Sequence, residues 1–321
     1  MSPTKSDKSG AVSVYKQPGL PTLTQQAEPR GDMPSFAIAL GGGGARGLAH
    51  IPILEALDEL GIRPRIIAGT SIGALMGAAY ASGISGADMR SYCSELFSKR
   101  VAVIKRLFSR LNSEDDSFTG FLSKTMNATM PFFPGERVLE ALLPPELPAT
   151  FEGLKIPFLA VTTDFYMQTQ YVISEGPLIP AIAASAALPG VLRPVELDGR
   201  VLVDGGFVNP LPFDVFKGEA DVTAAIDVSP GPSRGKDGKK QFPSLMEAMV
   251  GSPQIALNTI IREKLKTNAP DILIRPHIGH FLVLDFFKFE EIFTASEAAK
   301  EEFKRACEKA ITRHRKTLGR G

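Results

Sequence analysis

A serine enclosed by glycines, at the junction between an apolar run and a run of small residues, constrains the fold of this chain more than any other feature. Residues 69–73 read Gly-Thr-Ser-Ile-Gly. Residues 62–68 before them predict a short buried strand, and residues 74–79 after them predict a helix packed closely against its neighbours. The junction has the pattern of a nucleophile elbow, a turn so sharp that its flanking positions tolerate almost no side chain.

The pentapeptide by itself leaves two interpretations open. In the first, Ser71 is a catalytic nucleophile, and the helix that follows directs its unpaired N–H groups toward whatever the serine holds. In the second, the glycines only allow the strand and the helix to pack closely. The residues before and after the junction decide between the two.

An alternation of strands and helices surrounds this junction. Residues 36–40 predict a strand, residues 41–47 form a glycine-rich loop, and apolar positions from Leu48 to Leu60 mark one face of a helix that ends at Gly61. This β–α–β–α order is typical of a parallel sheet covered by helices. Further helices are predicted at 85–96, 180–188, 244–266 and 290–315, strands at 154–163, 170–174, 221–227 and 271–277, and a hairpin at 191–203.

The composition is that of a globular protein. Of the 321 residues, 44% are hydrophobic and 22% are charged, and the net charge of +1 provides no global field that would recruit nucleic acid. No run reaches the ~18 apolar residues of a membrane span. Residues 1–33 lack the apolar core of a signal peptide and are rich in polar residues, so we expect a disordered tail in a cytoplasmic protein. Because the last predicted strand extends the same sheet, we expect a single domain over residues 34–321.

Cysteines and histidines show no metal-binding or redox spacing. Cys93 and Cys307 are expected to be free thiols of a reducing compartment, although their number also allows a single bridge. The four histidines are scattered and form no cluster of metal ligands. We therefore expect no metal and no cofactor.

The glycine-rich loop has three interpretations. It contains Gly-x-Gly-x-x-Gly from Gly42 to Gly47, but a dinucleotide site requires an acidic residue at the end of the next strand, where this chain has Gly-Thr-Ser. A phosphate-binding loop requires Gly-Lys-Ser/Thr, which this loop lacks. The third interpretation, an oxyanion hole built from the N–H groups of Gly42, Gly43 and Gly44, also explains the serine at the next strand end. Arg46 orients this loop, holds an anionic group, or is an ordinary surface or salt-bridged side chain.

An acidic residue followed by two glycines ends the predicted hairpin. Asp204 precedes Gly205 and Gly206, a composition typical of sites where the backbone approaches a ligand. It is a candidate base for Ser71. A triad that includes a histidine from residues 277–280 is the mechanistic alternative, since the order nucleophile, acid, base is that of α/β-hydrolases. We favour the dyad, because in those hydrolases the oxyanion loop belongs to a separate, earlier strand unit, whereas here it lies in the strand–helix unit just before the elbow.

Together these motifs resemble the patatin-like phospholipase family. The resemblance rests on residues 42–47, 69–73 and 204–206, with further signatures at 184–190 and 209–212, and covers about residues 36–216. It implies a three-layer α/β/α sandwich with a mostly parallel sheet, in which residues 217–321 form a C-terminal extension. It also implies hydrolysis of lipid acyl esters, as by a phospholipase A or a lysophospholipase, through a Ser–Asp dyad that needs no metal.

The resemblance also implies a role for each motif residue. Ser71 is the expected nucleophile and Asp204 the expected base. The loop residues Gly42, Gly43, Gly44 and Arg46 are assigned to the oxyanion hole, and Gly47, Gly69, Gly73, Gly205 and Gly206 support the elbow and the motifs. The expected partner is a lipid substrate, with no nucleotide and no nucleic acid. A catalytically weak lipid-binding or regulatory module on the same fold is the alternative function.

Contact with a membrane surface is a further hypothesis with open alternatives. Residues 99–111 combine helical apolar periodicity with basic residues, which fits a helix on the inner membrane face or a helix with a solvated basic side. The basic end at 309–320 is a second candidate contact. Residues 121–134, rich in Phe and Met, fit either a lid or acyl-chain channel, or a satellite core cluster.

Overall fold

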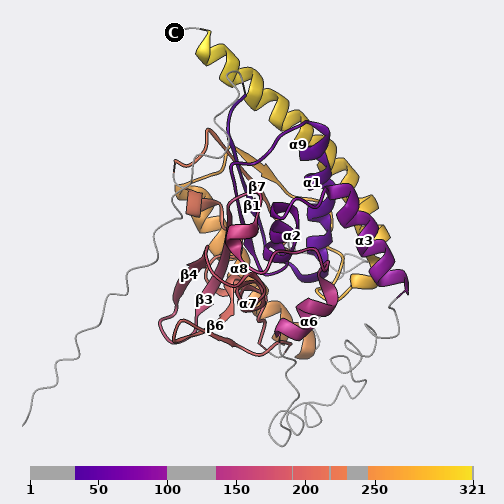
Figure 1. Ribbon diagram of the computed structural model, residues 1–321, viewed down its shortest axis with the longest axis vertical. Coiled ribbons are helices and arrows are strands. Elements are labelled where there is room, and N and C mark those ends of the chain that lie inside the picture. Colours follow the sequence, from indigo (N-terminus) through magenta and orange to yellow (C-terminus); the bar gives the residue numbers. More distant parts are fainter. Residues whose placement is uncertain (1–32, 100–134, 190, 217, 230–244, 320–321) are drawn as a thin grey trace, which may run out of the picture.

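The computed structural model describes residues 33–99, 135–189, 191–216, 218–229 and 245–319 (Figure 1). The predictions for the tail at 1–33, for the stretches 99–111 and 121–134 and for the loop at 229–240 concern residues outside this part, either entirely or at all but one position.

A mixed sheet lies at the centre of the described chain. Its strands are β1 (Phe36–Leu40), β2 (Ile66–Thr70), β3 (Phe158–Asp164), β4 (Thr169–Ile173), β5 (Val195–Leu197), β6 (Arg200–Asp204), β7 (Val222–Ile226) and β8 (Ile272–Ile274). Their order is β5-β6-β3-β2-β1-β7-β8, and β4 also pairs with β3. From β3 to β8 all neighbours in this order are parallel, whereas β4, β5 and β6 pair in antiparallel fashion. The mostly parallel sheet is therefore confirmed, and β8 extends it beyond β7 as predicted.

Helices cover both faces of this sheet (Figure 1). The helices of the described residues are η1 (Gly44–Ala49), α1 (His50–Glu59), α2 (Ile72–Ala81), α3 (Gly86–Lys99), α6 (Gly135–Leu142), η2 (Phe151–Gly153), α7 (Leu178–Ser185), η3 (Gly205–Phe207), η4 (Phe213–Phe216), α8 (Leu245–Thr267), η5 (Phe286–Lys288) and α9 (Phe289–Leu318). On β1, Phe36, Ile38 and Leu40 pack into a core shared with α1, α2, α7 and α9. The alternate residues Ala37 and Ala39 face a second core that includes η4 and α8. This two-sided burial makes the three layers.

Two strands begin later than the sequence pattern suggests. The predicted strand at 62–68 is observed as β2 from Ile66 to Thr70, and the one at 154–163 begins at Phe158. Pro64 and Pro157 stand just before these starts. Since proline has no N–H to donate to a ladder of strand hydrogen bonds, both residues mark the ends of pairing rather than strand interiors.

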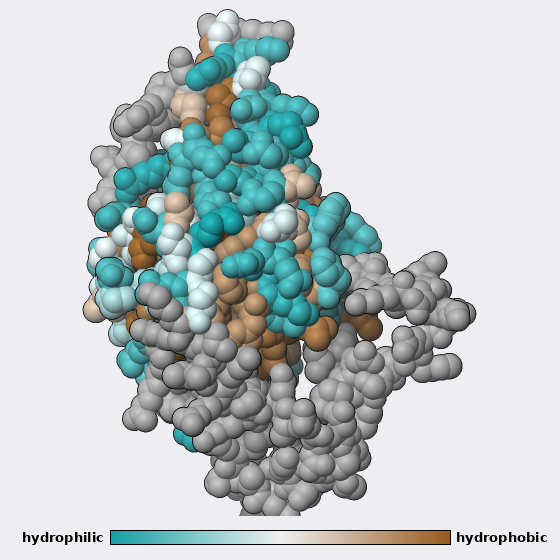
Figure 2. Space-filling view, turned by 90° about the vertical axis from the view of Figure 1, so that its right-hand side faces the viewer, coloured by the Kyte–Doolittle hydropathy of each residue, from teal (hydrophilic) through white to brown (hydrophobic). Residues whose placement is uncertain are grey.

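Helix α9 forms one long side of the molecule, where it packs along α1 and α3 (Figure 1). Figure 2 looks onto that side and shows hydrophilic side chains over the helices, with a hydrophobic area exposed between them. Within the described residues, no helix combines the length and the apolar character that a membrane crossing requires.

Candidate active site

The turn between β2 and α2 has the strained backbone of a nucleophile elbow. Ser71 lies between the two elements with φ 56° and ψ −123°, a conformation that non-glycine residues rarely adopt. Such strain costs on the order of 1–3 kcal/mol and persists only where surrounding contacts hold it. Here the Ser71 N–H donates to Ser185 Oγ at 3.0 Å, and Thr70 Oγ1 donates to the Asn209 carbonyl at 2.8 Å.

Glycines around the elbow are required by close backbone contacts. A Cβ atom on Gly73 would lie 2.1 Å from the Leu40 carbonyl oxygen, and one on Gly69 would lie 2.3 Å from the Gly73 carbonyl oxygen. A Cβ atom on Gly47 would enter the side chain of Ile72 at 2.2 Å. The helix therefore touches the strand tip and the loop through bare backbone, as close packing at this junction requires.

Strand pairing brings Asp204 beside Ser71, although 133 positions separate them in the chain. Strand β3 pairs with β2 up to Val161, whose partner is Thr70, and its next residue, Thr162, pairs with Asp204 on β6. Since β4 occupies the other edge of β3 along this stretch, β6 continues the edge on which β2 ends. Ser71 Oγ donates a hydrogen bond of 2.6 Å to Asp204 Oδ2.

Backbone and side-chain contacts fix the Asp204 carboxylate. The carboxylate Oδ1 accepts from the Gly206 N–H at 2.7 Å. In the backbone of Asp204, the N–H donates to the Ala187 carbonyl and the carbonyl accepts from Thr163 Oγ1 at 2.8 Å. A Cβ atom on Gly205 would lie 2.1 Å from the Val161 carbonyl oxygen, so this position also needs glycine. The predicted Asp-Gly-Gly motif therefore holds one carboxylate in a single orientation.

Burial tunes the acidity of this carboxylate. Asp204 is only 5% exposed, and desolvation raises its pKa from 3.8 to about 6, against the opposing effect of the hydrogen bonds from Ser71 and Gly206. A carboxylate with a pKa near 6 is ionised at neutral pH and accepts a proton more readily than an ordinary aspartate. The pair can thus remove a proton from the serine hydroxyl.

The glycine-rich loop differs from the predicted oxyanion hole at one of its three amides. The Gly42 N–H donates to the Pro210 carbonyl at 2.9 Å and is not available to a substrate. Among the described residues, the amides of Gly43 and Gly44 have no acceptor. Gly44, with φ +59°, lines the cavity that contains Ser71. The predicted donors are therefore reduced from three to the two at Gly43 and Gly44.

Arg46 holds this loop in place rather than facing the cavity. Its guanidinium donates to the carbonyls of Val228 at 3.2 Å and Phe281 at 3.0 Å, and it is only 3% exposed. Burial lowers its pKa to about 10, with the nearby Asp285 acting in the opposite direction. Of the alternatives weighed for Arg46, the structure supports orientation of the loop, and its guanidinium is not a donor to the oxyanion hole.

The histidines do not complete a triad in this arrangement. Asp204 contacts Ser71 directly, whereas a triad needs an imidazole between them. His277 and His280 are exposed. His50 is fully buried, where burial lowers its pKa to about 4, and its neutral ring donates from Nε2 to the Gly41 carbonyl at 2.9 Å. It therefore has a structural role in holding the start of the glycine-rich loop.

A cavity of about 120 Å³ opens beside Ser71. Apart from that serine and the backbone of Gly44, its walls are apolar and come from α2, α6, and the segments at 186–192 and 283–286. None of these lining residues is charged. The site therefore combines one reactive polar pair with a hydrophobic enclosure.

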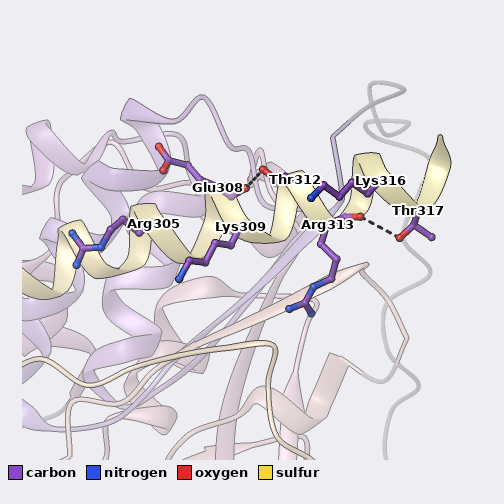
Figure 3. Close-up of a pocket in the computed structure, with 7 residues that line it drawn as sticks. All are labelled: Arg305, Glu308, Lys309, Thr312, Arg313, Lys316 and Thr317. Carbon is purple, nitrogen blue, oxygen red and sulfur yellow. Dashed lines mark hydrogen bonds between the residues drawn. The ribbon is translucent and has the colours of Figure 1, made fainter. Parts of the chain in front are cut away.

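A larger hollow lies along the end of α9, far from this chemistry in the chain (Figure 3). Its lining side chains, from Arg305 to Thr317, all come from that helix and include Lys309 and Arg313 together with Glu308. Figure 3 shows them spread along one helix side, with Thr312 Oγ1 donating to the Glu308 carbonyl. Since the described residues that line it all come from one helix, this hollow is treated as an open surface rather than an enclosed site.

Two residues that stabilise the site, Ser185 and Lys264, were given no role from the sequence. Ser185 Oγ, which accepts from the elbow, donates to the Val161 carbonyl at 2.7 Å and so ties the elbow to β3. Lys264 on α8 donates to Asn209 Oδ1, to the Leu211 carbonyl and to Asp214 Oδ1. Ser185 and Asn209, the partner of Lys264, lie in the stretches 184–190 and 209–212 that resemble family signatures, and nothing else in the sequence pointed to them. Nothing local distinguishes Lys264 from a surface lysine.

The described residues include no group suited to hold a metal ion, and the two cysteines lie outside the site around Ser71. Within the described residues, no group of three or more His, Cys, Asp or Glu side chains lies close enough together to hold a metal ion. Cys93 and Cys307 are free and buried, so the alternative of a single bridge between them does not hold.

Comparisons with known proteins match the described core. A family model described as "Patatin-like phospholipase" matches residues 38–217. An uncharacterized NTE family protein of Mycobacterium tuberculosis is 37% identical over 205 residues, which cover 63% of this chain and 52% of the relative. Patatin-like phospholipase domain-containing protein 7 of Rattus norvegicus is 31% identical over 288 residues, which cover 80% of this chain and 20% of the relative. The chain thus spans about half the length of the mycobacterial relative and a fifth of the rat one.

Solved structures match over most of the chain at low identity. VipD from Legionella pneumophila aligns with a TM-score of 0.44 and 14% identity, over 91% of this chain and 71% of the other. ExoU in its complex with SpcU from Pseudomonas aeruginosa aligns with a TM-score of 0.40 and 18% identity, over 96% of this chain and 61% of the other.

Proposed function

The chain belongs to the patatin-like phospholipase family, whose membership implies lipid hydrolase activity, and from that premise we propose that Ser71 and Asp204 cleave carboxylic ester bonds of lipids as a catalytic dyad. One observation carries the proposal: the 2.6 Å hydrogen bond from Ser71 Oγ to a buried carboxylate, made from a strained elbow. The raised pKa of Asp204 supports its role as base.

The proposed reaction has two halves. As Ser71 Oγ attacks the ester carbonyl, its proton passes to Asp204, and the carbonyl oxygen becomes an oxyanion. The amides of Gly43 and Gly44 stabilise that oxyanion by hydrogen bonds, usually the largest single contribution in acyl transfer. When the carbon–oxygen bond to the alcohol breaks, Asp204 returns the proton to the leaving alcohol. Asp204 then takes a proton from the water that attacks the acyl-enzyme, and it returns this proton to Ser71 Oγ as the bond to the acyl group breaks.

The hydrolase type and its surroundings follow from the same proposal. Because the serine supplies the nucleophile and the aspartate the base, phospholipase A or lysophospholipase chemistry can proceed here without a metal, and activity should survive EDTA. The lipid substrate suggests transient contact with a membrane surface. We treat residues 34–321 as one catalytic domain, since β8 extends the sheet and α9 packs on α1.

Two substitutions test the dyad. Ser71→Ala and Asp204→Asn should each lower kcat for ester hydrolysis by on the order of 10⁴-fold, the loss typical of such groups. A fluorophosphonate probe should label the wild-type chain at Ser71 and leave Ser71→Ala unlabelled. Ser91→Ala, on the exposed side of α3, is the matched control and should keep full activity. Full activity in either dyad variant would refute the proposal, and lipid binding without turnover of any ester would favour the binding-module alternative.

A further inference from the structure

We propose that the cavity at Ser71 and a second apolar cavity beneath α3 form one acyl-chain track, in which Leu142 and Phe286 separate a compartment for short chains from one reached only by longer chains. The inference rests on the proposed function, because it assumes that the bound group is the acyl part of an ester held at Ser71. It adds the determinant of chain length, which the proposed reaction leaves open.

Helix α2 provides the floor of the track. Ile72 and Leu75 line both cavities, and Met76 and Ala79, one turn further along, line only the second. Residues three and four apart lie on one helix face, so these side chains form a continuous surface that leads away from Ser71. From Ile72 to Ala79 the helix advances ~10 Å at 1.5 Å per residue. That length accommodates roughly eight carbons of a zigzag chain whose bonds are ~1.5 Å long.

The two cavities meet at a wall of side chains. The side chains that line both are Ile72 and Leu75 from α2, Leu142 from the end of α6, and Phe286 from the start of η5. Leu142 is only partly buried and Phe286 packs against Phe97 with ring centroids 5.9 Å apart. Because rotations of side chains alone can open such a wall, a chain can pass without movement of the sheet.

The size of the first cavity makes the second one necessary for long chains. Its volume of about 120 Å³ is somewhat below the ~150 Å³ of a protein cavity that holds benzene, a ligand of six carbons. The second cavity adds about 70 Å³. A butyryl group therefore fits the first compartment alone, whereas an octanoyl group must reach past Leu142 and Phe286.

The second compartment selects an acyl chain rather than a polar group. Among the described residues that line either cavity, none is Asp, Glu, Lys or Arg. The thiol at the far end, Cys93, is 8% exposed, and burial raises its pKa to about 12, so it stays neutral and behaves as a small hydrophobic group. A head group bearing charge would lose its hydration here, and it must remain on the solvent side of Ser71.

A series of p-nitrophenyl esters from acetyl to palmitoyl tests the track. For the wild-type protein, kcat/KM should rise about fourfold for each methylene buried, the equivalent of ~0.8 kcal/mol per group, and should level off near eight carbons. Leu142→Trp, which enlarges the wall, and Cys93→Phe, which fills the far compartment, should each lower the ratio of octanoyl to acetyl kcat/KM at least tenfold. Ser91→Phe places the same bulk on the exposed side of α3 and should leave that ratio unchanged.

Fatty-acid binding separates failure of the track from failure of the proposed function. If esters are hydrolysed but both track variants keep the wild-type ratio, the track is refuted and the hydrolase stands. If no ester is hydrolysed, the binding of butyrate, octanoate and palmitate to the wild-type chain and to Cys93→Phe decides. The track is supported if the wild-type chain binds the longer fatty acids more tightly and Cys93→Phe abolishes this dependence on length. Equal binding of all three acids to the wild-type chain overturns it. Thermal unfolding of each variant shows whether it is folded, and Leu142→Ala, expected to raise the ratio, replaces Leu142→Trp if that variant unfolds.

Discussion

The Asp204 carboxylate should destabilise the folded protein at neutral pH, and Asp204→Asn should remove that cost. Burial raises the pKa of this group from 3.8 to about 6. A group whose pKa is higher in the folded than in the unfolded state binds its proton more tightly when folded. The protonated carboxyl group therefore contributes its full stabilisation of the folded state below about pH 4, and this stabilisation is lost as the pH rises through about 6. Above that pH, the native state must hold an unfavourable buried charge.

The size of the effect follows from the same two pKa values. At 1.36 kcal/mol per pKa unit, the difference between 3.8 and about 6 corresponds to about 3 kcal/mol. Asparagine mimics the neutral carboxyl group at every pH. The free energy of unfolding of Asp204→Asn minus that of the wild type should therefore increase by about 3 kcal/mol between pH 3.5 and pH 7.5, whatever constant difference the altered hydrogen bonds add.

Urea unfolding at a series of pH values measures this difference directly. The transition is followed by circular dichroism for the wild type, Asp204→Asn and the control Ser91→Ala, which keeps every acidic group and should follow the wild type throughout. The reasoning would be refuted if the free energy of unfolding of Asp204→Asn minus that of the wild type stayed constant from pH 3.5 to pH 7.5. Such a result would mean that Asp204 has the same pKa in the folded and the unfolded state. A loss of activity together with a gain of stability would show strain maintained for chemistry.

Further predictions concern the same site. Because the proposed mechanism needs the ionised form of Asp204, kcat/KM should fall about tenfold per pH unit below its pKa of about 6. A pH-independent rate between 4 and 7 would contradict this role. Ser185→Ala leaves the Ser71 amide without its acceptor and should lower the free energy of unfolding, measured by urea titration, by about 1–3 kcal/mol. An unchanged urea midpoint would contradict this prediction. Gly43→Ala would place a Cβ atom 2.7 Å from the Val228 carbonyl oxygen, so we expect kcat to fall on the order of 10²-fold, as when an oxyanion donor is lost. Wild-type kcat in that variant would show that this amide is not a donor.

The elbow and the fold class could be predicted because their signals are local. Glycines at 69 and 73 indicate close backbone packing on both sides of one serine, and in the structure an added Cβ atom would lie only 2.3 Å from backbone oxygen at Gly69 and 2.1 Å at Gly73. For the oxyanion loop, the structure removes two of the predicted members, and the donor role of Gly43 and Gly44 stays a prediction. Gly42 and Arg46 are engaged by Pro210, Val228 and Phe281, which lie far away in the sequence. No pattern within residues 41–47 reveals such partners.

By itself, the sequence determined that strands and helices alternate around Ser71, since hydrophobic periodicity and glycine positions act over a few residues. Only the tertiary structure decided that Asp204 reaches Ser71, because their contact depends on β6 continuing the edge of β3 where β2 ends. It also decided the acidity of that carboxylate and the supporting role of Lys264, because desolvation and long-range hydrogen bonds exist only once distant segments have packed together.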